Sequence, residues 1–130
     1  MDNRNDLRQG RSVVSKLNVH LVFVTKYRQT RFTEAMLNDL KTWAKVICEK
    51  MEAQLIELNG EKDHIHLLVE YPPKLSVSQL VNSLKGVTAR RFNQKYQAHL
   101  DGKKLWSPSY FAISCGGAPL AVIQKYIENQ

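Results

Sequence analysis

Two histidines that flank a single isoleucine, His64 and His66, have the spacing of a metal-binding pair. They begin a stretch, residues 63 to 71, whose branched apolar residues predict a β-strand. Because strand side chains alternate between the faces of a sheet, both imidazoles should point one way and Ile65 should point into the core. Neutral imidazole is a common metal ligand, so the pair suits a divalent cation. Two half-exposed histidines on a sheet surface are the alternative. His20 and His99 lack such a partner and are expected in a strand and a loop, respectively.

The segment from 119 to 130 predicts an amphipathic helix that carries a phenol. Ile123 and Ile127 belong to its apolar stripe. Tyr126 and Gln130 are four residues apart, so they share one helix face one turn apart. A tyrosine can act as a covalent nucleophile, and an amide oxygen can bind a hard cation. A tyrosine that only packs beside the stripe is the alternative. The other phenols in the chain are Tyr27, Tyr71, Tyr96 and Tyr110.

Positive charge dominates the surface chemistry of the chain. Lys and Arg number 19 against 12 acidic residues, a formal net charge of +7. This balance favours a polyanionic partner, because each cation placed on a phosphate releases counterions. Several cations stand near aromatic residues, which suits single-stranded nucleic acid whose bases stack on rings. The rings are Tyr27, Phe92, Tyr96 and Trp106, and the expected nucleic-acid contacts are Lys26, Arg28, Lys85, Arg90, Arg91 and Lys104.

Length and composition indicate one domain over residues 1–130, opened by a polar segment, 1–15, that is loose or lies at a sheet edge. Hydrophobic residues make up 43% and charged residues 24%, as in ordinary globular proteins. Cys48 and Cys115 are isolated in sequence, which favours reduced, buried thiols over a thiolate metal site. No apolar leader segment opens the chain, and we expect a cytoplasmic protein.

The elements that must position these residues follow a β-α-β-β-α-β order with an added helix. Asn59 and Gly60 predict a turn, Ser76 with Gln79 predicts a capping box, and Gly86 inside a helix indicates close approach of another backbone or DNA. The order is that of the ferredoxin-like α+β fold, an antiparallel sheet with two helices on one face. The expected strands are 17–25, 55–58, 63–71 and 110–114, and the expected helices are 34–51, 77–97 and 119–130, with a loop over 98–109.

Five sequence blocks in this order resemble the single-tyrosine transposases of small bacterial and archaeal insertion sequences, a branch of the HUH (histidine, hydrophobe, histidine) nucleases. The resemblance covers residues 17 to 130. The blocks are Lys26-Tyr27-Arg28, Asp63-His64-Ile65-His66, Leu84-Lys85-Gly86 with Arg90, Leu105-Trp106 to Ser109, and Gly116-Gly117-Ala118-Pro119 to Gln130.

The resemblance implies a site and a reaction. His64 and His66 match the family's metal ligands, Gln130 matches a third ligand, and Glu61 stands where relatives can place a carboxylate near the metal. Tyr126 matches the nucleophile, which would form a 5′-phosphotyrosine. Magnesium or manganese is the implied metal. Hairpins in single-stranded DNA at the element ends are the implied substrate. Members act as homodimers, in which an active site can combine the histidines of one subunit with the tyrosine helix of the other.

Three other interpretations stay open from the sequence. The same fold also occurs in nucleic-acid-binding modules that use the sheet as a stacking platform. A metal-dependent hydrolase that acts through activated water would form no covalent protein–DNA adduct. A domesticated relative would act on host DNA repeats instead of on its own element.

Overall fold

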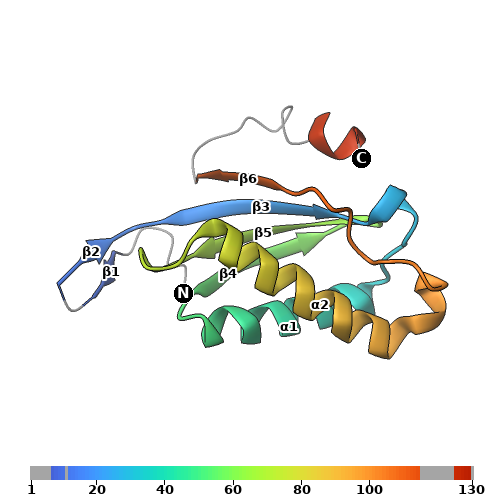
Figure 1. Cartoon of the computed structure of the whole chain (residues 1–130), viewed down its shortest axis with the longest axis horizontal. Helices are drawn as coiled ribbons and strands as arrows, with labels where there is room; N and C mark the ends of the chain where they lie inside the picture. The colour runs from blue at the N-terminus through green and yellow to red at the C-terminus, as the bar shows by residue number, and fades with distance from the viewer. Residues whose placement is uncertain (1–6, 11, 115–124, 130) are drawn as a thin grey trace.

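The computed structural model describes residues 7–10, 12–114 and 125–129. Its main sheet is antiparallel, as predicted for the ferredoxin-like fold. The strands lie in the order β4-β5-β3-β6, and all three neighbouring pairs are antiparallel. Figure 1 shows α1 and α2 on one side of this sheet and residues 125–129 on the other. The elements are β3 (Asn18–Val24), η1 (Lys26–Arg28), α1 (Glu34–Lys50), β4 (Gln54–Gly60), β5 (His64–Glu70), α2 (Val77–Leu100) and β6 (Phe111–Ser114).

The central strand β3 is apolar on both faces because both faces are covered. Leu21 and Phe23 pack in the core beneath α1 and α2. Val22 and Val24 alternate with them and pack against Ile127 on the opposite face. Burial on both sides explains why this strand is a nearly continuous apolar run instead of an alternating one.

Side-chain caps set where the two long helices begin. Thr33 Oγ1 accepts a hydrogen bond from the Met36 N–H at the start of α1. At the start of α2, the Gln79 N–H donates to Ser76 Oγ and the Ser76 N–H donates to Gln79 Oε1, so the predicted capping box is confirmed. Each such cap stabilises a helix by about 1 kcal/mol.

Two local predictions are wrong. Asn59 and Gly60 belong to β4, and the chain turns after them. A Cβ at Gly60 would lie 2.5 Å from Cδ2 of Leu37, so this glycine allows α1 to pack closely on the strand. Helix α2 continues to Leu100, which makes His99 an exposed helical residue and not a loop residue.

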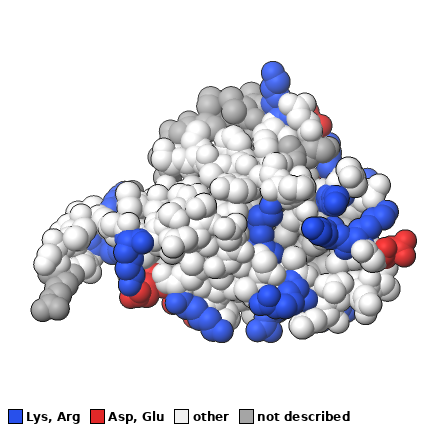
Figure 2. Space-filling model, in the orientation of Figure 1, with Lys and Arg blue, Asp and Glu red and all other residues white. Residues whose placement is uncertain are grey.

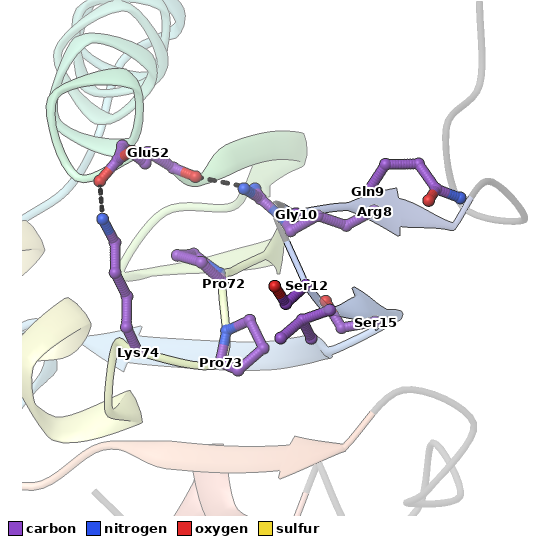
Figure 3. Close-up of a pocket in the computed structure, with 10 residues that line it drawn as sticks. Arg8, Gln9, Gly10, Ser12, Ser15, Glu52, Pro72, Pro73 and Lys74 are labelled. Atoms are coloured by element: carbon purple, nitrogen blue, oxygen red, sulfur yellow. Dashed lines mark hydrogen bonds and ion pairs between the residues drawn. The ribbon is translucent and has the colours of Figure 1, made fainter.

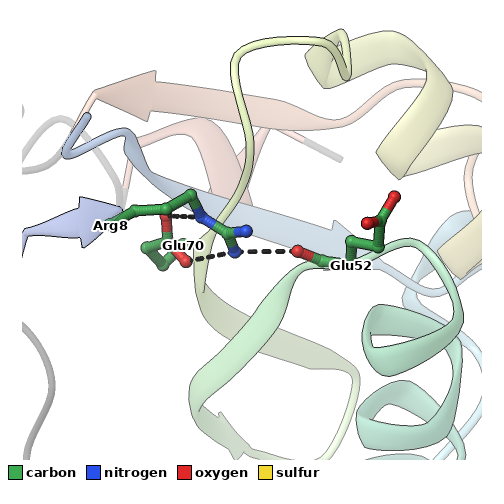
Figure 4. Close-up of polar contacts among 3 residues, drawn as sticks. All are labelled: Arg8, Glu52 and Glu70. Atoms are coloured by element: carbon green, nitrogen blue, oxygen red, sulfur yellow. Dashed lines mark hydrogen bonds and ion pairs between the residues drawn. The ribbon is translucent and has the colours of Figure 1, made fainter. Parts of the chain in front are cut away.

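The described part of the N-terminal segment, expected to be loose or to lie at a sheet edge, contains a separate two-stranded sheet. Strands β1 (Arg8–Gln9) and β2 (Val14–Ser15) pair as an antiparallel hairpin. The Arg8 guanidinium donates to both carboxylate oxygens of Glu70, at 2.7 and 2.6 Å, and to the backbone carbonyl of Glu52 at 2.7 Å (Figure 4). A hollow of about 550 Å³ separates the hairpin from Pro72, Pro73 and Lys74 (Figure 3).

Two further sequence expectations can be compared with the described residues. Cys48 is fully buried, and burial raises the pKa of its thiol to about 12, as expected for an unreactive structural cysteine. Cys115 lies outside the described residues. Within the part of the chain that the structure describes, no helix combines the length and the apolar character needed to cross a membrane.

Candidate active site

Strand β5 places the two predicted histidines side by side on the sheet face opposite α1 and α2. The ring centroids of His64 and His66 are 5.0 Å apart. Ile65, between them, is 1% exposed and belongs to the core beneath the helices. A third imidazole, His20 on β3, has its ring centroid 5.6 Å from that of His66. Burial, with smaller effects of His64 and His20, lowers the pKa of His66 to about 4, so this imidazole is neutral near pH 7 and can donate its lone pair to a cation.

A buried carboxylate orients His64. Asp63 Oδ1 lies 3.0 Å from Nδ1 of His64, and Arg28 Nε donates to Asp63 Oδ2 at 2.8 Å. Burial acts to raise the pKa of Asp63, but the hydrogen bonds of His64 and Arg28 outweigh it, so the pKa falls and the carboxylate stays ionised. An ionised acceptor at Nδ1 favours the tautomer with its proton there, which leaves the lone pair on Nε2 for a metal.

The turn after β3 delivers Arg28 to that carboxylate. Tyr27 and Arg28 both have positive φ, 56° and 55°, a conformation uncommon for residues other than glycine. Strained backbone of this kind concentrates at functional sites. The sequence predicts Arg28 as a DNA contact and indicates no role for Asp63. The detectable signal for Asp63 was a carboxylate directly before the histidine pair.

Tyr126 lies on the same face of the sheet as the histidines. Residues 125–128 are helical, and Ile127 packs on Val22 and Val24. Those two valines are the cross-strand partners of His66 and His64.

The Tyr126 phenol is held by β6 and the segment before it. Its ring centroid is 5.5 Å from that of Phe111, and its hydroxyl lies 3.1 Å from Ser109 Oγ. Burial raises the pKa of Tyr126, and the hydrogen bond with Ser109 only partly opposes this, so the phenol is protonated at neutral pH.

The other two predicted metal ligands are Gln130 and Glu61. Gln130 lies outside the described residues. Glu61 is exposed, and its backbone N–H donates to the carbonyl of His64 at 3.0 Å. Across residues 7–10, 12–114 and 125–129, no group of three or more His, Cys, Asp or Glu side chains is arranged to hold a metal. The histidine pair offers two nitrogen donors, and a metal held there would need further ligands.

The predicted DNA contacts fall into three groups by their surroundings. Lys85 Nζ donates to the backbone carbonyls of Ser107, Pro108 and Ser109 at 2.7 to 3.3 Å, and Arg28 pairs with Asp63, so both cations have partners within the chain. Lys26 Nζ lies 5.5 Å from the centroid of the Tyr27 ring. Arg90, Arg91 and Lys104 are exposed, and no ion pair links them to an acidic side chain among the described residues.

Two of the predicted stacking rings are core residues. Phe92 is fully buried and Trp106 is 5% exposed. The Trp106 indole N–H donates to Thr88 Oγ1 at 3.0 Å inside the core. Tyr27, in contrast, is 71% exposed and is available to a base.

Comparisons with known proteins identify the family. The family model described as "Transposase IS200 like" matches residues 13–130, so this chain belongs to the IS200-like transposase family. It is 33% identical over 128 residues to the ISDra2 transposase TnpA of Deinococcus radiodurans, covering 96% of this chain and 91% of that protein. It is 30% identical over 114 residues to the transposase for insertion sequence element IS200 of Salmonella typhimurium, covering 85% of this chain and 74% of that protein. Family membership establishes a DNA transposase.

Solved structures agree with the fold. A crystal structure of a candidate transposase from Deinococcus radiodurans superposes with a TM-score of 0.86 at 35% identity, covering 95% of this chain and 97% of that one. A REP-associated tyrosine transposase bound to a REP hairpin superposes with a TM-score of 0.59 at 10% identity, covering 93% of this chain and 68% of that one. The second match shows a shared fold alone.

Proposed function

We propose that this transposase cuts and rejoins single-stranded DNA at the ends of an insertion sequence through a covalent 5′-phosphotyrosine at Tyr126. The observation that carries the proposal is the packing of Ile127 on Val22 and Val24. Those valines pair across the sheet with His66 and His64, so the tyrosine segment and the imidazoles share one face.

The reaction balances without an external energy source. The Tyr126 oxygen attacks the scissile phosphorus, a P–O bond to tyrosine forms, and the bond to the 3′ oxygen of the preceding nucleotide breaks. The phenol proton is lost to a base or solvent, and the leaving 3′ oxygen takes up a proton. Rejoining reverses these steps, because the phosphotyrosine keeps a diester bond of similar energy.

A divalent cation is part of the proposal. The neutral imidazole of His66 and the neighbouring ring of His64 suit Mg²⁺ or Mn²⁺, with Gln130 as the proposed third ligand and Glu61 as a nearby carboxylate. Such a cation would offset the charge that develops on the phosphate. Asp63 contributes by keeping the Nε2 lone pair of His64 directed away from the carboxylate.

The proposed substrate is a hairpin in single-stranded DNA, and the proposed active form is a homodimer that can share its active sites between subunits. Identities of 30 to 33% to insertion-sequence transposases support element ends over host repeats as the substrate. The REP-associated relative was solved with a REP hairpin, which supports a hairpin ligand for this fold.

Trapping the covalent intermediate tests the proposal. The protein is incubated with Mn²⁺ and labelled single-stranded DNA that carries the hairpin-forming flanks of its own gene, then run on a denaturing gel. The wild type and a Tyr27→Phe control should give a labelled protein band, and Tyr126→Phe should bind the DNA without forming it. Cleavage without a band would indicate a hydrolase that uses water, and binding without cleavage would indicate a non-catalytic module.

A further inference from the structure

A groove of about 630 Å³ runs between α2, from Lys85 to Leu100, and the segment that follows this helix. Every charged residue that lines it is basic: Lys85, Arg90, Lys103 and Lys104. Figure 2 shows Lys and Arg side chains gathered on the side of the molecule where Figure 1 places this part of α2 and the segment after it. A concave surface with cations of one sign attracts and orients a polyanion.

Gly86 leaves a strip of helix backbone open to this groove. The residue is exposed, lies inside α2, and lines the groove. A Cβ built on Gly86 would meet no atom within 4 Å, whereas one on Gly60 would collide with Leu37. Glycine is a poor helix former, and within the described residues no neighbour requires it here. The vacant space therefore fits a ligand that comes close to the helix backbone.

The groove leads to the candidate nucleophile. Lys85 lines it, and its Nζ holds the carbonyls of Ser107, Pro108 and Ser109. Ser109 Oγ in turn lies 3.1 Å from the Tyr126 hydroxyl. These two contacts connect the Lys85 end of the groove, on the helix side of the sheet, to the serine that touches the phenol.

Two of the lining cations remain available for an anion. Lys85 is committed to backbone carbonyls, and Lys103 Nζ donates to Gln29 Oε1 at 3.0 Å. Arg90 and Lys104 have no acidic partner in the part of the chain that the structure describes. Both can therefore contact phosphates without first breaking an ion pair.

We propose that this groove binds the backbone of the single-stranded DNA next to the scissile phosphate, with phosphates on Arg90 and Lys104 and close approach at Gly86. The nature of the ligand rests on the proposed function. The groove adds a path for the strand, and it explains a glycine that no neighbour among the described residues requires.

DNA binding by the groove can be measured apart from DNA cleavage in the Tyr126→Phe variant, which lacks the candidate nucleophile. Fluorescence anisotropy with a labelled, unstructured thymidine oligomer of roughly 20 nucleotides reports affinity over a salt series. Gly86→Gln should weaken binding about tenfold by filling the groove beside a stacking or phosphate contact. Gly86→Ala should raise the melting temperature by about 3 °C, because alanine is the better helix former and the space is open.

Charge variants test the same groove without changing the helix backbone. Arg90→Gln and Lys104→Gln should each reduce the slope of log affinity against log salt by about 0.7, the value for one lost phosphate contact on a single strand. Lys41→Gln removes the same charge from an exposed position on α1 and should leave the slope unchanged.

Two results would contradict the proposal that this groove binds single-stranded DNA. One is wild-type affinity for Gly86→Gln, and the other is a loss in Lys41→Gln equal to that in Lys104→Gln. Absence of a covalent adduct would contradict the assignment of Tyr126 as the nucleophile but would not change these binding results. The two proposals can therefore fail separately.

Discussion

Asp63 contacts His64 and Arg28 through different oxygens of one carboxylate. Its Oδ1 lies 3.0 Å from Nδ1 of His64, and its Oδ2 accepts a hydrogen bond from Nε of Arg28 at 2.8 Å. Asp63 is 5% exposed, and its contact with His64 is buried, whereas the Arg28 side chain is 39% exposed. The carboxylate thus links the turn after β3 to the first imidazole of the histidine pair. Groups that hold a ligand imidazole in this way fix its tautomer and raise its basicity.

Replacing this carboxylate should weaken metal binding. Asp63→Asn keeps the size of the side chain but removes its charge, and we expect Mn²⁺ affinity to fall about tenfold. Electron paramagnetic resonance of free Mn²⁺ during a titration measures this affinity. Asp101→Asn makes the same change at an exposed position and should bind Mn²⁺ like the wild type. Equal affinity in Asp63→Asn would remove this residue from the site.

Lys85 should matter for stability as well as for the groove. Its Nζ serves three backbone carbonyls, and Lys85→Met would leave them without that donor. We expect the free energy of unfolding in urea to fall by about 1–3 kcal/mol. Lys41→Met, at an exposed site on α1, should change it by less than about 0.5 kcal/mol. If Lys85→Met were as stable as the wild type, water would satisfy the three backbone carbonyls as well as Lys85 does.

The N-terminal hairpin should depend on one ion pair. Arg8→Met would leave the Glu70 carboxylate, 7% exposed as a residue, without its bidentate partner. We expect a loss of about 2 kcal/mol in the free energy of unfolding, partly recovered when Glu70→Gln is added. The Lys74–Glu52 pair is the matched control, because its side chains are 67% and 64% exposed. Lys74→Met should therefore cost less than about 1 kcal/mol. If Arg8→Met and Lys74→Met lowered the free energy of unfolding equally, burial of the Arg8–Glu70 pair would not add to stability.

The rate of adduct formation should rise with pH. Burial raises the pKa of Tyr126 above its ordinary value, so at neutral pH the reactive phenolate is a small fraction that grows as pH increases. Single-turnover rates should increase roughly tenfold per pH unit well below that pKa. Quenched-flow gels across neutral and mildly alkaline pH measure this slope. A rate that is flat over this range would mean that phenol deprotonation does not limit the step.

Local patterns predicted the parts of the site that depend on local geometry. The period of a strand places His64 and His66 on one face whatever surrounds them, and the rings are 5.0 Å apart. The Ser76 and Gln79 capping box also depends on four consecutive positions, and it forms as predicted. Order and type of the main elements follow from the same short-range signals.

Long-range partners explain what the sequence could not show. Arg28 was assigned to DNA, because nothing nearby in the chain reveals that Asp63, 35 residues away, receives it. Trp106 was counted as a stacking ring because lysines precede it, but Thr88 on α2 satisfies its indole inside the core. Gly60 was expected in a turn. Its side chain is instead limited to hydrogen because the Leu37 side chain of α1 packs against it.

Mass spectrometry of the trapped protein–DNA adduct can locate the nucleophile. After nuclease and trypsin digestion, a residual nucleotide should be found on the peptide that follows Lys125, which begins with Tyr126 and contains no other tyrosine. A nucleotide on a peptide that carries Tyr27, Tyr71, Tyr96 or Tyr110 instead would contradict it.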